Sequence, residues 1–298
     1  MTTTHTLTTA DADIAYDLHG PPPSADGVRP LVMIGQPMTA EGFTALAFYF
    51  PDRPVVTYDP RGLGRSVRKD GRVDNDPAVQ AADLHALVVE LGVGPVDVFA
   101  SSGGAVTALA WVTTHPEDIV VLVDHEPPLL SVLPDAAAAE RGFERIRDAY
   151  DAGGFGPGMA AFIGYTSWQG EITDEFLAQP LPDPAQFGMQ MPDDGARDSP
   201  LLSDRSWAII RYQPDIEALR AAPTRIVTAV GEESAGVLTD RTSRALAALL
   251  GQEVVVFPSH HGGFQDASGG YPGQPEAFAK TLREVLAADG VPDGGAGR

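Results

Sequence analysis

The chain has 298 residues, of which 43% are hydrophobic and 20% are charged, and this composition is typical of a globular protein with a large core. Its formal net charge of −21 argues against partners such as nucleic acid or anionic membrane surfaces, because both are bound through basic patches. The absence of cysteine excludes disulfides, thiolate catalysis and cysteine-bound metals.

Strand and helix patterns alternate along the first part of the chain, which predicts a mostly parallel α/β sheet. Residues 5–19 alternate polar and apolar, as in an exposed antiparallel hairpin. Buried strands are predicted for the apolar runs at 31–34, 55–58, 96–100 and 119–123. A helix is predicted after Asp76, because this residue is a good N-cap, Pro77 suits the first helical position and Gly92 follows the apolar face.

The alternation stops at residues 127–215, which are rich in Pro, Gly, Ala and aromatic residues and predict a helical insertion. The core then resumes, with strands predicted at 224–230 and 253–257 and helices at 238–250 and 275–288. We therefore predict four parts: a first core segment (1–126), a helical cap (127–215), a second core segment (216–290) and a disordered tail (291–298). No apolar run reaches the ~20 residues of a membrane span, and the N-terminus lacks signal-peptide features, so we expect a cytoplasmic protein.

Residues 96–111 carry the most specific local pattern in the chain. An apolar strand breaks into a turn of small residues, Ala100-Ser101-Ser102-Gly103-Gly104, and a buried helix follows. This layout is that of a nucleophile elbow, which is usually written G-x-S-x-G and here has alanine in the first glycine position. By register the nucleophile is Ser102.

Further chemistry-bearing segments follow other predicted strands, at the sheet edge where open α/β sheets bind ligands. The turn at 35–38 places the backbone N–H of Gln36 as an oxyanion-hole donor, together with that of Gly103. The segment 59–66 contains G-x-G, but Val67 stands where a dinucleotide site needs its third glycine, so we reject that interpretation.

Two more strand ends supply an acid and a base. Glu126 lies just after the strand at 119–123, and the adjacent pair His260 and His261 lies in a glycine-rich loop after the last strand. The order Ser102, Glu126, His261 is the chain order of a serine-hydrolase triad on an α/β sheet. No metal-ligand spacing accompanies the histidine pair, so no metal is predicted.

With these residues in place, the sequence resembles the α/β-hydrolase superfamily over nearly its whole length, and in particular its esterase and lactonase members. The carrying motifs are D-x-R-G-x-G-x-S at 59–66, G-x-P at 35–37 and H-G-G-F at 261–264, although Ile34 replaces the family's usual His before the G-x-P turn. The resemblance implies a mostly parallel eight-stranded sheet flanked by helices, and a helical cap at 127–215. It also makes His261 the triad histidine and His260 its neighbour.

The acid is the main departure from the family pattern. Many members carry Asp after the strand before the last, where this chain has Gly231-Glu232-Glu233-Ser234. Glu232 or Glu233 could act from a shifted loop, or the acid could have moved one strand earlier to Glu126. Zearalenone-type lactonases resemble the second case, because they carry a His-Glu-x-Pro segment like the one at 125–128. We favour Glu126.

Together these features predict a serine hydrolase that cleaves a neutral, hydrophobic, medium-sized carboxylic ester or lactone, without cofactor or metal. The cap is expected to line a large apolar pocket. Met38 of the core is one candidate for substrate contact, and the candidates from the cap are Met159, Phe162, Ile163, Tyr165, Trp168, Phe187, Met189, Met191 and Trp207. Alternatives on the same fold are a cofactor-free perhydrolase, a C–C hydrolase and an acyltransferase. A non-catalytic small-molecule-binding protein and an interaction protein are further alternatives. The sequence also leaves open whether the protein forms a homodimer, because small helical caps often support dimers in this fold.

Overall fold

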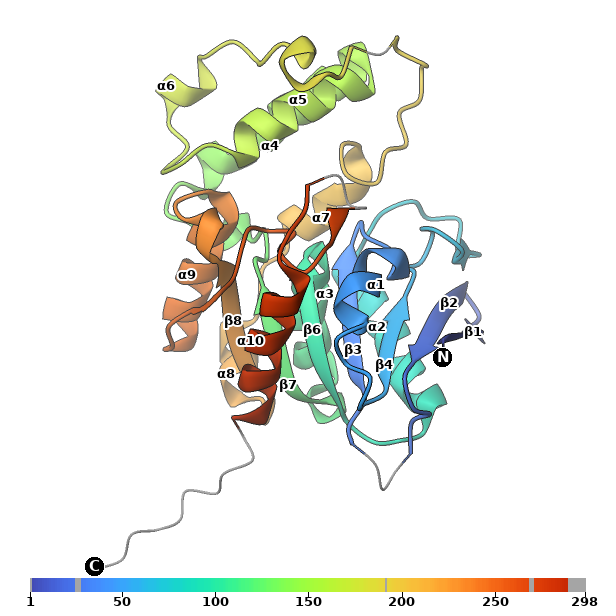
Figure 1. The fold of residues 1–298 in the computed structure, drawn as a ribbon. Helices are drawn as coiled ribbons and strands as arrows, with labels where there is room; N and C mark the ends of the chain where they lie inside the picture. Colours follow the sequence, from blue (N-terminus) through green and yellow to red (C-terminus); the bar gives the residue numbers. More distant parts are fainter. Residues whose placement is uncertain (1, 25–27, 191, 268–270, 289–298) are drawn as a thin grey trace, which may run out of the picture.

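A computed structural model describes residues 2–24, 28–190, 192–267 and 271–288 (Figure 1). Its centre is one twisted sheet with the strand order β1-β2-β4-β3-β6-β7-β8-β9, in which the short strand β5 also pairs with β2. The strands from β4 to β9 along this order are parallel, and β1, β2 and β5 pair antiparallel. Their bounds are β1 Thr2–Thr8, β2 Ala12–His19, β3 Leu31–Gln36, β4 Val55–Tyr58, β5 Val67–Arg68, β6 Val96–Ser102, β7 Ile119–His125, β8 Arg225–Gly231 and β9 Val255–Phe257.

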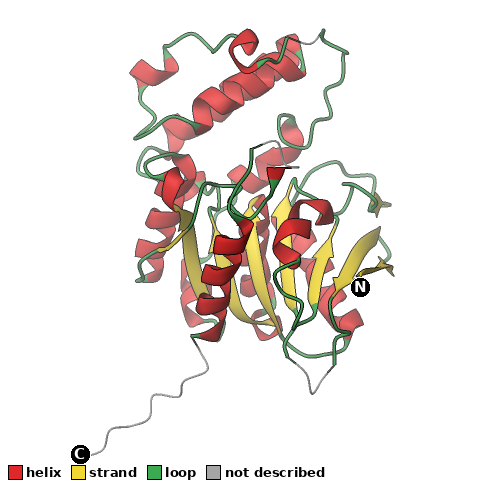
Figure 2. Cartoon of the chain, viewed as in Figure 1, coloured by secondary structure: helices red, strands yellow, loops and turns green. Residues whose placement is uncertain are grey.

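Helices cover both faces of the sheet, which explains why the central strands are apolar throughout (Figure 2). One face packs against α2 (Pro77–Leu91), α3 (Gly103–Thr114), α8 (Ile216–Ala221) and α9 (Leu238–Leu250). The other face packs against α1 (Thr44–Ala47) and α10 (Pro275–Ala287). Each central strand therefore contributes alternate side chains to two separate apolar cores.

The cap segment, residues 127–215, lies over the edge of the sheet at which the parallel strands end (Figure 1). Its main elements are α4 (Ala136–Gly153) and α5 (Phe155–Thr166), which form a third apolar core around Phe143, Tyr150 and Tyr165. Shorter pieces complete it: η3 Leu130–Val132, α6 Asp174–Leu177, η4 Pro184–Phe187, η5 Asp204–Ser206 and α7 Trp207–Ile210. The remaining short 3-10 helices belong to the core segments: η1 Ala40–Phe43, η2 Pro116–Asp118 and η6 Glu232–Ser234.

The predicted α/β architecture is confirmed, with differences in detail. Helix α2 has the predicted bounds, and the Asp76 side chain accepts a hydrogen bond from the Ala78 N–H while Gly92 ends the helix with a φ of 63°. The sheet has nine strands rather than eight, because the two-residue strand β5 adds to β2. Near the end of the predicted helical insertion, residues 204–210 form two single turns, and the predicted tail at 291–298 lies outside the described residues. None of the described helices is long and apolar enough to cross a membrane.

Glycines let helix α3 approach strand β3 at backbone distance. A Cβ on Gly104 would lie 2.5 Å from the Cα of Gly35 and 2.7 Å from the carbonyl oxygen of Ile34. These are backbone atoms, which cannot turn aside as the end of a side chain does. The start of α3 is therefore held against the end of β3 only because position 104 has no side chain.

We expect Gly104→Ala to lower the free energy of unfolding by about 3 kcal/mol or more, because the overpacked backbone must move. The matched control is Gly71→Ala, where a Cβ meets nothing within 4 Å. There only the positive φ of 70° disfavours alanine, at a cost of about 1–2 kcal/mol. Urea unfolding followed by circular dichroism measures both variants, and equal losses would contradict the close approach.

Candidate active site

Ser102 stands at the turn between β6 and α3, with φ 57° and ψ −130°. This backbone conformation is rare for a residue with a side chain, and it is typical of a nucleophile elbow. Ser102 is half-buried and lines a cavity beneath the cap, whereas the neighbouring Ser101 is buried and its hydroxyl lies 3.1 Å from Nδ1 of His125. The register of the turn therefore turns Ser102, and not Ser101, toward the cavity.

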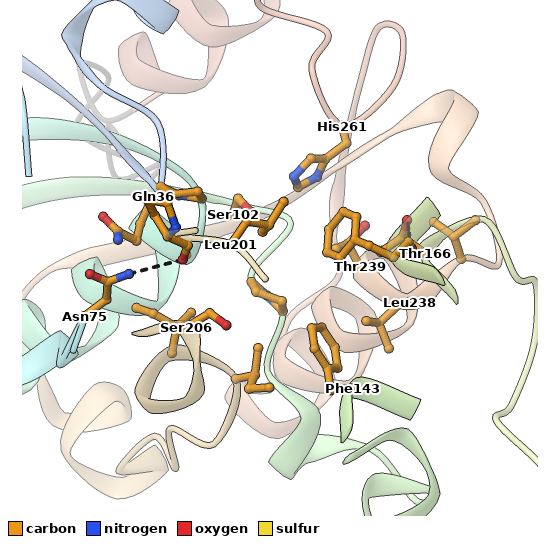
Figure 3. Close-up of a pocket in the computed structure, with 18 residues that line it drawn as sticks. Gln36, Asn75, Ser102, Phe143, Thr166, Leu201, Ser206, Leu238, Thr239 and His261 are labelled. Atoms are coloured by element: carbon orange, nitrogen blue, oxygen red, sulfur yellow. Dashed lines mark hydrogen bonds between the residues drawn. The ribbon is translucent and has the colours of Figure 1, made fainter. Parts of the chain in front are cut away.

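His261 lines the same cavity from the loop after β9 (Figure 3). Its Nδ1 lies 2.6 Å from Oε2 of Glu126, which directly follows β7. The adjacent His260 points elsewhere: its ring packs on Tyr271 and its Nε2 lies 3.2 Å from the carbonyl oxygen of Pro272. The structure thus brings together Ser102, His261 and Glu126 at the carboxyl edge of the sheet.

Glu126 is fully buried, and several groups satisfy its carboxylate. Besides His261, the backbone N–H of Gly231 donates to Oε1 at 2.8 Å and the Thr239 hydroxyl donates to Oε2 at 2.6 Å. The Ser234 hydroxyl also hydrogen-bonds this carboxylate. A buried charge is stable only with such a complete set of partners.

The pairing changes the pKa of both partners. Burial on its own would raise the pKa of Glu126, but the hydrogen bond from His261 and the nearby histidine charges outweigh burial and hold that pKa well below its usual value. Burial also acts to lower the pKa of His261, but the hydrogen bond and charge of Glu126 prevail and raise it. Glu126 is therefore ionised at neutral pH, and it favours a proton on Nδ1 of His261.

The other two acid candidates do not reach His261. Glu232 and Glu233 are exposed in η6, where Oε1 of Glu232 accepts a hydrogen bond from the Ser259 N–H. Ser234, which occupies the position of the family's usual Asp, is buried and bonds Glu126 instead. The loop after β8 therefore contacts the carboxylate of Glu126, which follows the neighbouring strand β7.

Non-glycine residues with positive φ mark all three loops. Within the described part of the chain these residues are Ser102 (57°), Glu126 (52°) and Ser259 (70°), the last of them two residues before His261. Such conformations cost about 1–3 kcal/mol each and persist where the surrounding structure imposes them, often at functional sites. The strain in this backbone is concentrated where the three candidate side chains converge.

The two predicted oxyanion-hole residues are neighbours. Gln36 pairs with Ser102 in the parallel register between β3 and β6. A Cβ on Gly103 would lie 2.8 Å from the carbonyl oxygen of Gln36 and 3.0 Å from its Cβ. The backbone at 36 and 103 therefore flanks Ser102 at contact distance.

The cavity has a volume of about 220 Å³ and is mostly apolar (Figure 3). None of its described lining residues is Lys, Arg, Asp or Glu. The core segments and the cap both contribute to the lining, which consists of Gln36, Pro37, Asn75, Ser102, Gly103, Pro128, Phe143, Phe162, Thr166, Pro200, Leu201, Ser206, Ile209, Ile210, Val237, Leu238, Thr239 and His261. The volume is below the ~300–1,000 Å³ of common ligand pockets, so the pocket is smaller than the sequence led us to expect.

Comparison with known proteins assigns the family. The sequence profile of the alpha/beta hydrolase family matches residues 18–281. This chain belongs to the alpha/beta hydrolase family. A curated relative, the uncharacterized hydrolase YraK of Bacillus subtilis, is 28% identical over 268 residues, which are 87% of this chain and 89% of YraK.

Solved structures agree with the fold of the family. An esterase from Thermogutta terrifontis has a TM-score of 0.63 and 19% identity, over 95% of this chain and 98% of its own. A proline iminopeptidase from Mycobacterium smegmatis has a TM-score of 0.60 and 18% identity, over 96% of this chain and 100% of its own. These structures confirm the alpha/beta hydrolase fold, and the hydrolase relatives support hydrolase activity in this chain.

The predicted substrate-binding residues are distributed differently from our expectation. Phe162 lines the cavity, and Met38 instead lines a neighbouring surface groove. Trp168 packs on Phe176 within the cap, and Trp207 stacks with the Arg211 guanidinium, 3.9 Å from the ring centre. At helical spacing these aromatic residues serve the packing of the cap. Among the other cap candidates, Met159, Ile163, Tyr165, Phe187 and Met189 are also not in the lining, and Met191 lies outside the described residues.

Sequence reasoning missed several cavity residues. Asn75 lies in the loop before α2, and Ser206 lies at the return from the cap. Thr239 is the second residue of α9, and no sequence pattern predicted its hydrogen bond to Glu126. Loop residues of this kind carry no periodic signal, and only tertiary contacts bring them to the cavity.

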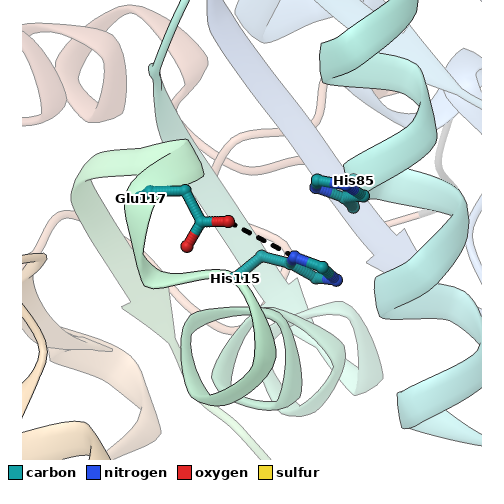
Figure 4. A group of neighbouring side chains, drawn as sticks. All are labelled: His85, His115 and Glu117. Atoms are coloured by element: carbon teal, nitrogen blue, oxygen red, sulfur yellow. Dashed lines mark ion pairs between the residues drawn. The ribbon is translucent and has the colours of Figure 1, made fainter.

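A group of possible metal ligands lies on α2 and around η2, away from the cavity lining (Figure 4). His85, His115 and Glu117 each offer one ligand atom within 4.8 Å of the others. However, the two imidazole rings stack 3.7 Å apart at an angle of 9°, and Nδ1 of His85 lies 2.8 Å from Asp118. Stacked rings direct their lone pairs along parallel lines, so both rings would have to rotate to hold one ion.

We expect the pKa of His261 to lie above its ordinary value of 6.5 and to be lower in Glu126→Gln than in wild type, because the hydrogen bond and charge of the carboxylate are removed. Glu233→Gln is the matched control and should leave the pKa of His261 unchanged. Imidazole ¹⁵N NMR across the neutral pH range measures all three proteins, with the resonance assigned by His261→Asn. An unaltered pKa in Glu126→Gln would show that this pair is not electrostatically coupled.

Proposed function

We propose that the protein is a serine hydrolase that cleaves a neutral, largely apolar carboxylic ester or lactone through Ser102, His261 and Glu126. The observation that carries this proposal is the 2.6 Å contact between Nδ1 of His261 and the buried Glu126, with Ser102 on a strained elbow in the same cavity. The family membership supports a hydrolase, and the chemistry of these side chains narrows the reaction to acyl transfer to water.

The reaction runs in two steps. Because Glu126 holds a proton on Nδ1 of His261, Nε2 is free to accept the proton of Ser102 as its Oγ attacks the carbonyl carbon. The tetrahedral intermediate collapses, the bond from carbon to the leaving oxygen breaks, and Nε2 returns the proton to the departing alcohol. Water then attacks the acyl-enzyme in the same way and releases the acid and free Ser102.

The backbone amides of Gln36 and Gly103 are the proposed donors to the oxyanion. Gly103 follows Ser102 in the turn, and Gln36 pairs with Ser102 at the end of the neighbouring strand β3, which supports a place for the carbonyl oxygen of a bound ester between them. Each such donor stabilises the transition state by about 3 kcal/mol in comparable sites. No metal or cofactor is required, because the buried carboxylate and the imidazole supply the base.

The cavity favours a neutral substrate. Its described lining has no Lys, Arg, Asp or Glu side chain that could pair with a carboxylate or an ammonium group. Its walls are mostly aliphatic and aromatic, and the net charge of −21 repels anions at long range. Esters and lactones of short to medium chain length fit this environment, so the cavity is compatible with both substrate classes.

Ser102→Ala is expected to fold normally and to lose at least about 10³-fold in kcat on p-nitrophenyl butanoate, because the nucleophile is removed. Ser101→Ala is the control, since it removes a hydroxyl one residue away that bonds His125. Intact mass after reaction with a fluorophosphonate should show one adduct on wild type and Ser101→Ala, and none on Ser102→Ala. An adduct that persists in Ser102→Ala would disprove the nucleophile.

Glu126→Gln is expected to lower kcat by about 10²–10⁴-fold, because the amide neither stabilises the imidazolium nor fixes its tautomer. Glu233→Gln, which changes an exposed side chain in the loop where many relatives carry the acid, should stay within about twofold of wild type. Steady-state kinetics on the same ester compares the two. The reverse ranking would transfer the acid role to Glu233.

A further inference from the structure

Two carboxamide side chains in the cavity lack partners. Gln36 is 4% exposed, and neither its Nε2 nor its Oε1 has a hydrogen bond within the described structure. Asn75 is 2% exposed, and its Oδ1 likewise has none. Its Nδ2 makes only a long contact of 3.5 Å to the carbonyl oxygen of Pro200. Both side chains lie on the same wall of the cavity, across from Thr166 and Thr239 (Figure 3).

The remaining polar side chains in the lining are engaged. Thr166 bonds the carbonyl oxygen of Phe162, Ser206 bonds that of Ser203, and Thr239 bonds Glu126. Apart from Ser102 and Nε2 of His261, the unfilled hydrogen-bonding capacity of the described lining is therefore concentrated at Gln36 and Asn75. A buried amide without a partner costs about 1–3 kcal/mol, so an apolar residue of similar size would suit a purely structural wall better.

The fold holds Gln36 beside the nucleophile and fixes the loop of Asn75 at the same cavity. Gln36 ends β3, and its Cγ would lie 3.2 Å from a Cβ on Gly103, the residue after Ser102. The backbone N–H of Asn75 donates to the carbonyl oxygen of Arg205 at 3.0 Å. The Arg205 guanidinium in turn bonds the carbonyl oxygens of Val73 and Gly62, so the loop of Asn75 is tied to the return from the cap.

We propose that Gln36 and Asn75 form a recognition site for a neutral hydroxyl group on the substrate, close to its scissile carbonyl. A carboxamide presents both a donor and an acceptor, so two of them bind a hydroxyl by donating to its oxygen and accepting its proton. The absence of Lys, Arg, Asp and Glu from the described lining disfavours an ionic group at this place. This inference rests on the proposed ester or lactone hydrolysis, and it names the substrate class as hydroxylated apolar esters or lactones.

A substrate hydroxyl that reaches these amides supplies the hydrogen bonds they lack, whereas a hydrocarbon in its place leaves them unpaired. A site built for a hydroxyl therefore discriminates strongly against the analogue that lacks it. The same argument predicts an effect on stability. Gln36→Met removes an unpartnered polar group from an apolar wall, so its Tm should equal or exceed that of wild type, whereas the loss of a structural hydrogen bond would lower it.

The test compares matched substrates. The probes are methyl hexanoate, its derivatives hydroxylated at the third, fourth or fifth carbon, and the pair ethyl and 2-hydroxyethyl hexanoate, with acid release followed by an indicator dye. In wild type at least one hydroxylated ester should exceed its parent in kcat/KM by about 10-fold or more. In Gln36→Met and Asn75→Leu this ratio should fall to about twofold or less, because the discriminating groups are gone. Thr166→Val is the control on the opposite wall and should keep the wild-type ratio.

The outcomes separate this inference from the proposed function. Esters cleaved without a preference for hydroxyl, or with a preference that both variants retain, would overturn the recognition site and leave the hydrolase intact. If no ester is cleaved, the proposed function fails, and calorimetric binding to the Ser102→Ala protein decides the recognition site alone. Tighter binding of a hydroxylated ester than of its parent, lost when Asn75→Leu is added, supports the site. Equal binding overturns it.

Discussion

The buried carboxylate of Glu126 is the interaction on which the arrangement of this site depends. A charge without solvent must be satisfied by fixed donors, and here the donors come from separate parts of the chain. Gly231 ends β8, Ser234 lies in η6, Thr239 lies in α9 and His261 lies in the loop after β9. One carboxylate thus fixes the relative positions of four segments. The imidazole is oriented because it is one of the hydrogen-bond donors that this carboxylate requires.

A second constraint acts on the other side of Ser102, where backbones meet without side chains between them. Gly35 and Gly104 allow α3 to start against the end of β3, so positions 36 and 103 both lie beside the nucleophile. Charged groups then hold the neighbouring loops. The Asp59 carboxylate accepts a hydrogen bond from the Ala40 N–H, just after the turn at 35–38. Arg61 forms an ion pair with the buried Asp83 of α2. The D-x-R-G segment therefore supports the site from outside the cavity.

The sequence predicted the core well because its signals are local. Apolar runs bounded by turns define the strands, and the Asp76 and Gly92 caps define α2 to the residue. Ser102, Glu126 and His261 could be named as candidates because each lies at or soon after the end of a strand, and all parallel strands end at one edge. Most of the cavity wall contributed by the cap could not be named, with Phe162 as the exception. Trp168 and Trp207 have the periodicity of helix packing and serve it, whereas Asn75 reaches the cavity only through the tertiary contacts of Arg205.

The strained residues 102, 126 and 259 carry a consequence for the evolution and engineering of this chain. In each of these positions a glycine would relieve the backbone, since glycine adopts positive φ without steric cost. At 102 the same change deletes the side chain on which the proposed chemistry depends, whereas at 126 it also removes the buried carboxylate that joins four segments, which offsets the relief. Selection for thermal tolerance alone would therefore drive the protein toward inactive sequences. Libraries built for heat resistance need a turnover screen at every round, or the most robust survivors will be those that have lost the site.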